Sequence, residues 1–185
     1  MIEFLKKAII DQVLKIVSYN MHDLYQGFHF LKELSVVNDI ILVQELWLTN
    51  RDFDKLSVSD DFIVFAASAM DITLSHGVLK GRPFGETGVL IRKRLAARAK
   101  LIGSDKRFII VQIDHLLICC VYMPCSSVPC QLDLVNDTLA SVSNMIDACT
   151  YTSIIIGGDF NLSFKEHNIF RDLIRNCGKI LFTFD

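Results

Sequence analysis

The chain alternates short, strongly apolar runs with polar segments, a pattern typical of sheets that are buried on both faces. The runs are rich in Ile, Val and Leu, and β-branched side chains fit a pleated sheet. In the clearest run, "IIIGGD", three isoleucines lead into two glycines and a carboxylate. We predict strands at residues 14–20, 39–45, 62–68, 87–93, 107–114, 115–124 and 153–159, with a hairpin turn at Asp114 and His115.

Three other segments place apolar residues at helical spacing, which predicts helices over residues 28–37, 131–149 and 165–178. The predicted strands outnumber these helices. Two packed sheets with helices outside are therefore predicted, rather than a doubly wound sheet. The chain has no internal repeat, low-complexity segment or linker, so we expect one α/β domain.

Polar side chains stand directly at the ends of three of these strands. Asn20 ends the first strand, Glu45 ends the second and Asp159 ends the last, with Asn161 two residues further on. If the strands are neighbours, these side chains converge on one patch. Carboxylate and amide oxygens suit Mg²⁺ or Mn²⁺, and a phosphate ester is the natural substrate for such a cation. Each residue alone is explained more simply as a turn residue or a solvated strand end, so their coincidence carries the hypothesis.

Basic residues are densest around the fourth predicted strand, in the segments "GVLKGRP" and "RKRLAARAK". One interpretation is a solvated hairpin, and the other is a surface that contacts the DNA backbone. For the second interpretation we single out Arg82, Arg92 and Lys93. Trp47 also has two interpretations, because it could pack in the core or stack on a base.

Composition limits the partners and the compartment. The 185 residues have a mean hydropathy of +0.38 and a formal net charge of −2, so no basic field draws the chain to nucleic acid or an anionic membrane. The six cysteines contain no C-x-x-C pair, and we interpret them as reduced, buried thiols. We find no signal sequence or membrane span, which predicts an intracellular protein of the nucleus or cytoplasm that is not secreted.

Five segments together resemble the endonuclease/exonuclease/phosphatase family, and most of all the apurinic-endonuclease-like domain of non-LTR retrotransposons. The resemblance implies a DNase I-like α/β/β/α sandwich of four layers and a Mg²⁺- or Mn²⁺-dependent endonuclease that nicks DNA. The segments are "SYN" at 18–20, "VQELWL" at 43–48, "GETGVLIRK" at 85–93, "VYMP" at 121–124 and "GGDFN" at 157–161.

The resemblance also implies a role for each matching polar residue. Glu45 would bind the metal, and Asn20 would bind the metal or the phosphate. Tyr122 would contact the scissile phosphate, Asp159 would orient or activate the attacking water, and Asn161 would hydrogen-bond the phosphate. DNA would be the substrate of a monomer that needs no small-molecule cofactor.

The chain departs from the family's pattern after "GGDFN", because no Ser-Asp-His segment follows. The histidine of that segment is the family's phosphate ligand or general base. We therefore expect an extension at residues 1–13 and an incomplete domain at 14–185, with weak or no activity, since a general base contributes about 10²–10⁴-fold in rate. The alternatives are a non-catalytic remnant and a phosphodiesterase for a lipid or small phosphate ester. His76, beside the glycine-rich loop, is a further candidate for a substrate contact.

Overall fold

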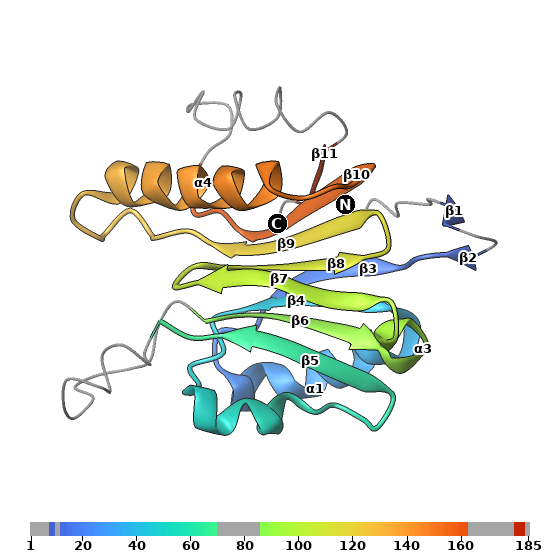
Figure 1. The fold of residues 1–185 in the computed structure, drawn as a ribbon. Coiled ribbons are helices and arrows are strands. Elements are labelled where there is room, and N and C mark those ends of the chain that lie inside the picture. Colours follow the sequence, from blue (N-terminus) through green and yellow to red (C-terminus); the bar gives the residue numbers. More distant parts are fainter. Residues whose placement is uncertain (1–7, 10–11, 70–85, 163–179, 184–185) are drawn as a thin grey trace.

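The computed structural model describes residues 8–9, 12–69, 86–162 and 180–183. Most of them form two large sheets that stack face to face (Figure 1), and a third sheet has only two short strands. Helix α4 (Gln131–Asp147) covers the outer face of one sheet, and helix α1 (Leu24–Val37) covers the outer face of the other. The four-layer sandwich predicted from the sequence is therefore confirmed. Within the described part of the chain, no helix is long and apolar enough to cross a membrane.

The first sheet has the strand order β3-β4-β6-β5. β3 and β4 are parallel neighbours, whereas β6 runs antiparallel to both β4 and β5. The carboxyl ends of β3 and β4 therefore lie at the same edge of the sheet. The strands are β3 (Ile16–Asn20), β4 (Ile40–Gln44), β5 (Phe62–Ala67) and β6 (Thr87–Arg92).

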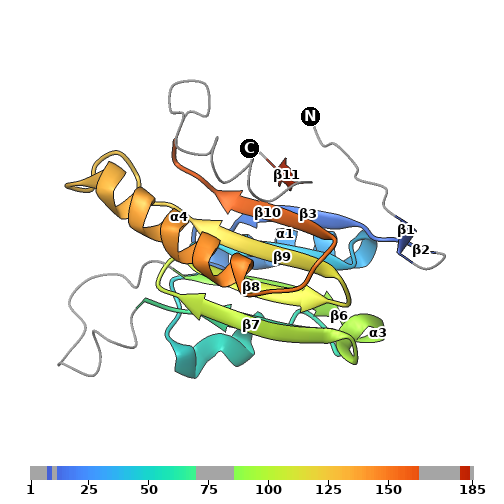
Figure 2. The same ribbon diagram turned by 45° about the horizontal axis from the view of Figure 1, so that its top comes forward.

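The second sheet has the order β11-β10-β9-β8-β7, and helix α4 lies across it (Figure 2). β9, β10 and β11 are parallel, and β8 pairs antiparallel with β7 and β9. Its strands are β7 (Ala99–Asp105), β8 (Phe108–Ile113), β9 (Leu116–Tyr122), β10 (Ser153–Asp159) and β11 (Ile180–Thr183). Short elements complete the described chain: β1 (Ala8–Ile9), β2 (Gln12–Val13), the 3₁₀ helix η1 (Asn50–Leu56) and α3 (Lys93–Ala96).

The strands are apolar throughout because both of their faces are buried. On β4, Ile40 and Leu42 pack into the core between the two sheets, whereas Ile41 and Val43 pack into the core under helix α1. A third core lies between the second sheet and helix α4. Side chains alternate between the faces of a strand, so a strand covered on both sides reads as a continuous apolar run.

The five cysteines in the described residues are free thiols. Cys119 faces the core under α4 and Cys120 faces the core between the sheets, which confirms that these neighbours point to opposite faces of a strand. Burial is confirmed for this pair but is wrong for Cys130, which is exposed in the loop before α4. Cys125 and Cys149 are only partly buried.

The seven predicted strands and the predicted hairpin turn are confirmed, with ends shifted by up to two residues. The helix predicted from residue 28 begins earlier, at Leu24, because Asp23 caps it by accepting a hydrogen bond from the Tyr25 N–H at 3.2 Å. The helix predicted over 131–149 ends at Asp147. The helix predicted over 165–178 lies outside the described residues.

The interpretation of the basic stretch as a hairpin is wrong. The segment "RKRLAARAK" forms the end of β6, the short helix α3 and the start of β7, and so carries the chain from the first sheet to the second. The segment "GVLKGRP" lies outside the described residues. β7 was not predicted because it is an edge strand whose residues are partly exposed, so it lacks an apolar run.

Candidate active site

Four strand ends meet at one edge of the two sheets. In the first sheet, Asn20 ends β3 and Glu45 directly follows β4. In the second sheet, Tyr122 and Asp159 end β9 and β10 and are register partners. The convergence that the sequence predicted is therefore observed, since parallel neighbours bring their carboxyl ends to the same edge.

A hydrogen bond joins the two sheets at this edge. The Asn20 side-chain amide donates to Asp159 Oδ2 at 2.8 Å, and the Asn161 backbone N–H donates to Asp159 Oδ1 at 3.0 Å. Burial raises the pKa of Asp159, the two hydrogen bonds oppose that rise, and the charge of Glu45 adds to it. Asp159 is thus a half-buried carboxylate whose orientation is set from both sheets.

Tyr122 interacts with both carboxylates. Burial raises the pKa of its hydroxyl well above the ordinary value, and the charge of Glu45 and a hydrogen bond to Glu45 raise it further. The charge of Asp159 acts in the same direction. Tyr122 is therefore a neutral hydroxyl that donates a hydrogen bond to the Glu45 carboxylate.

Glu45 also contacts His22, a residue that the sequence interpretation missed. His22 Nδ1 lies 2.9 Å from Glu45 Oε2, and the side chains are 76% and 14% exposed, respectively. The His22 ring also lies against Trp47, with 5.9 Å between ring centroids. One signal pointed to His22: it stands two residues after Asn20, at the same strand end as the predicted site.

Asn161 lies at the edge of the site and connects the neighbouring segments. Its backbone is left-handed, with φ of 48°, and its side-chain amide donates to the Met123 carbonyl at 3.0 Å. Gln131 of α4 donates to the Asn161 carbonyl at 3.2 Å. Asn161 thereby ties the turns that follow β9 and β10 to the start of α4.

Arg107 is a second residue that the sequence interpretation missed. The Tyr122 N–H donates to the Arg107 carbonyl at 2.8 Å, so the two backbones are neighbours. Burial lowers the pKa of the guanidinium, and the nearby Tyr122 and Cys125 groups oppose this effect. A half-buried cation therefore stands beside the site. Its signal was weak, because a single Arg before an apolar run is usually a solvated strand end.

Similarity to solved structures identifies the architecture. Humanized TDP2 from D. rerio with 14 mutations has a TM-score of 0.52 at 18% identity, covering 91% of this chain and 68% of that chain. A variant of the 3′ phosphatase NExo from Neisseria, bound to product DNA hairpin, has a TM-score of 0.61 at 14% identity, covering 88% and 71%. D. rerio TDP2 complexed with single strand DNA product has a TM-score of 0.52 at 19% identity, covering 86% and 64%.

The fold is DNase I-like. At these identities the similarity establishes the fold alone. No protein-family model and no curated protein matches the chain. The chemistry of this DNase I-like protein must therefore be argued from its own residues.

The site's donor set fits a divalent cation such as Mg²⁺. Glu45 and Asp159 supply carboxylate oxygens, and Asn20 supplies an amide oxygen at the same edge. Across the residues the structure describes, no three or more His, Cys, Asp or Glu side chains are arranged to hold an ion together. That is compatible with Mg²⁺, which keeps several waters and is commonly bound by one or two carboxylates plus substrate phosphates.

Arg92 and Lys93, two of the three residues predicted to contact DNA, lie away from this site. β4 and β6 are antiparallel, with Gln44 beside Thr87 and Ile40 beside Ile91, so Arg92 and Lys93 stand at the opposite end of the first sheet from Glu45. Lys93 is exposed. Arg82 and His76 lie outside the described residues.

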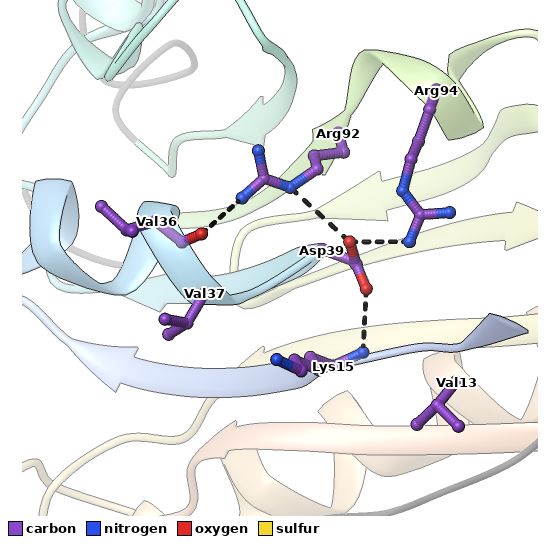
Figure 3. Close-up of a pocket in the computed structure, with 7 residues that line it drawn as sticks. All are labelled: Val13, Lys15, Val36, Val37, Asp39, Arg92 and Arg94. Carbon is purple, nitrogen blue, oxygen red and sulfur yellow. Dashed lines mark hydrogen bonds and ion pairs between the residues drawn. The ribbon is translucent and has the colours of Figure 1, made fainter.

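Arg92 lines a pocket of about 510 Å³ beside the end of helix α1 (Figure 3). Its guanidinium donates to the carbonyls of Asn38 and Val36, both at 3.1 Å, and lies 3.6 Å from the Asp39 carboxylate. Arg94 pairs with the same carboxylate at 2.8 Å. These contacts satisfy the last carbonyls of α1, a structural task that occupies most of the donors of Arg92.

Glu86 is a buried carboxyl next to the loop that carries Glu45. Its side chain is 0% exposed, and neither carboxyl oxygen makes a well-formed hydrogen bond. Burial raises its pKa to about 7, against some opposition from the backbone N–H groups of Glu86 and Trp47. The charge of Glu45 adds to the rise.

Replacing Glu86 with glutamine should flatten the pH dependence of stability. Between the ordinary pKa of 4.5 and the folded value of about 7, the unfolded chain ionises Glu86 while the folded protein keeps it protonated. The free energy of unfolding of the wild type therefore falls through this range, by about 3 kcal/mol in total, and is level above it. Urea denaturation at about pH 5 and about pH 8 measures the change in each protein.

The change in unfolding free energy between the two pH values is compared in the wild type and in Glu86→Gln. Burying the glutamine amide costs the same at both pH values, so this cost cancels within each change. We expect the wild type to lose about 2–3 kcal/mol more than Glu86→Gln between the two conditions. Equal losses in both proteins would contradict the raised pKa of Glu86.

Proposed function

We propose that this protein is a divalent-metal-dependent phosphodiester hydrolase that acts on DNA, of the kind that nicks target DNA for a non-LTR retrotransposon. The observation that carries the proposal is the hydrogen bond from Asn20 to Asp159, which joins the two sheets where Glu45 and Tyr122 also lie. This is one edge with two carboxylates, a neutral hydroxyl and amide donors. The DNA products bound to NExo and to TDP2 support DNA as the substrate class.

In this proposal Glu45 is the main ligand of the cation, with Asn20 beside it. The bound cation supplies charge that neutralises phosphate oxygens as they become more negative. Glu45 suits this task because its carboxylate is oriented by Tyr122 and His22 and stays partly accessible.

Asp159 orients the attacking water and accepts its proton. Both oxygens of Asp159 accept hydrogen bonds, which fixes the carboxylate plane, and its burial-raised pKa makes it a better base than an exposed aspartate. Tyr122 remains neutral, so its hydroxyl does not repel a phosphate oxygen. When Glu45 binds the cation, the single O–H of Tyr122 can turn from that carboxylate and donate to the phosphate.

The guanidinium of Arg107 would neutralise negative charge on the scissile phosphate. Its guanidinium is half-buried beside Tyr122, where an arginine–phosphate contact is strong because little water competes with it. Lys93 and Arg92 lie at the opposite end of the first sheet, too far away to contact the same phosphate.

Nicking of supercoiled plasmid tests the proposed function. The purified chain is incubated with plasmid and Mg²⁺, with EDTA as one control and Glu45→Ala as the other. Glu33→Ala is the matched variant, since Glu33 is an exposed glutamate on α1 that also pairs with a histidine. We expect weak nicking by the wild type and Glu33→Ala, and none with EDTA or Glu45→Ala. A folded wild type that leaves plasmid intact would favour the non-catalytic remnant.

A further inference from the structure

The contact between His22 and Glu45 is built into two adjoining loops. Asp23 N–H donates to the Glu45 carbonyl at 3.0 Å, and Met21 N–H donates to the Gln44 carbonyl at 2.9 Å. The Asn20 side chain also accepts from the His22 N–H at 3.0 Å. The two backbones are therefore fixed side by side before any ligand arrives.

Both residues hold a backbone conformation that non-glycine residues seldom adopt. φ is 56° at His22 and 55° at Glu45, in the left-handed region. Such strain persists only where the surroundings impose it. Here the two backbone hydrogen bonds between the loops and the Asn20 hydrogen bond within the first loop do so. An ordinary exposed ion pair contributes little to stability and does not require this arrangement.

The spacing of the two side chains suits a shared ion. His22 Nδ1 and Glu45 Oε2 are 2.9 Å apart. Two ligands at right angles on one octahedral ion, each about 2.1 Å from it, are about 3.0 Å apart. An imidazole nitrogen beside a carboxylate oxygen is a mixed ligand pair, which favours transition metals over Mg²⁺, whose preferred ligands are oxygens.

We propose that His22 and Glu45 together bind an imidazole-preferring divalent cation of the Ni²⁺, Co²⁺ and Zn²⁺ class, which competes with Mg²⁺ for Glu45. The proposal rests on the proposed function only in that Glu45 is the cation ligand. His22 thereby sets the metal preference of the site, and a cation of this class displaces the one that supports hydrolysis.

Trp47 provides a direct readout of binding. It is the only tryptophan of the chain, and its ring lies 5.9 Å from the His22 ring. A paramagnetic ion such as Ni²⁺ at the pair quenches its fluorescence. The titration uses Ni²⁺ on tag-free protein, and excess Mg²⁺ is then added to reverse the quenching.

Three variants complete the experiment. His22→Asn removes the imidazole, and asparagine tolerates the left-handed backbone at this position. His29→Asn is the matched control, because His29 is 83% exposed and pairs with Glu33 on helix α1. Glu45→Gln removes the other proposed ligand.

We expect His22→Asn to weaken Ni²⁺ binding by about tenfold or more, since even outer-shell partners of a metal commonly change affinity by about 10–100-fold. Glu45→Gln should weaken it similarly, and His29→Asn should bind as the wild type does. Quenching of His22→Asn at wild-type Ni²⁺ concentrations would overturn the inference. A different result would contradict the proposed function: Mg²⁺-dependent nicking that survives in Glu45→Ala. The two proposals can therefore fail independently.

Discussion

Replacing Asp159 with asparagine lowers the plasmid-nicking rate by about 10²–10⁴-fold, the amount that a general base contributes. The amide has nearly the same shape but cannot accept a proton from the attacking water. It also loses one of the two hydrogen bonds from Asn20 and Asn161, which costs about 1 kcal/mol of stability. Nicking rates at saturating Mg²⁺ measure the first effect, and urea denaturation measures the second.

Two controls separate chemistry from cation binding. Asp137→Asn removes an exposed aspartate on α4 and should nick as the wild type does. The Mg²⁺ concentration for half-maximal nicking should change little in Asp159→Asn, because Glu45 is the main cation ligand. A rate within about twofold of the wild type would remove Asp159 from the role of base, since loss of a base costs far more.

Replacing Gly158 with alanine should cost about 4 kcal/mol of stability or more, because backbone strain and overpacking each contribute about 1–3 kcal/mol. The φ of Gly158 is 142°, a region open mainly to glycine. A Cβ there would lie 1.9 Å from the Val121 carbonyl oxygen, a backbone atom that cannot move without opening the pairing of β9 and β10. Such a loss is a large part of the total stability of a domain, about 5–15 kcal/mol.

Gly103→Ala is the matched control for this prediction. Its Cβ would meet the Met145 sulfur at 2.8 Å, which is the far end of a flexible side chain. We expect a cost of about 1 kcal/mol or less there, since methionine adapts readily to changes in packing. Equal midpoints of urea denaturation for the two variants would show that the strand pairing at Gly158 tolerates a side chain.

The glycine pair of "GGD" stood out in the sequence because it follows an apolar run directly. The sequence did not show why the second position, Gly158, must be glycine. A glycine pair after an apolar run signals a close approach of some kind. Only the pairing of β10 with β9 shows that the approaching group is the Val121 carbonyl. The same pairing then carries Asp159 to its place beside Tyr122.

The sequence by itself determined seven strands of the two large sheets and the residues at their ends. Apolar runs with both faces buried leave a strong local signal, and a polar residue at the end of such a run stands out. Asn20, Glu45, Asp159 and Asn161 were found in this way, while Tyr122 was proposed from the family resemblance. None of these assignments required knowledge of which strands are neighbours.

The tertiary structure alone decided which of the other polar residues belong to the site. Arg92 was predicted to contact DNA, yet antiparallel pairing places it at the far end of the first sheet, where it binds the end of α1. His22, Glu86 and Arg107 are isolated polar residues in the sequence, and each acquires its environment from segments distant along the chain. Local pattern reports how deeply a residue is buried, whereas its partners depend on strand order and on the packing of the two sheets.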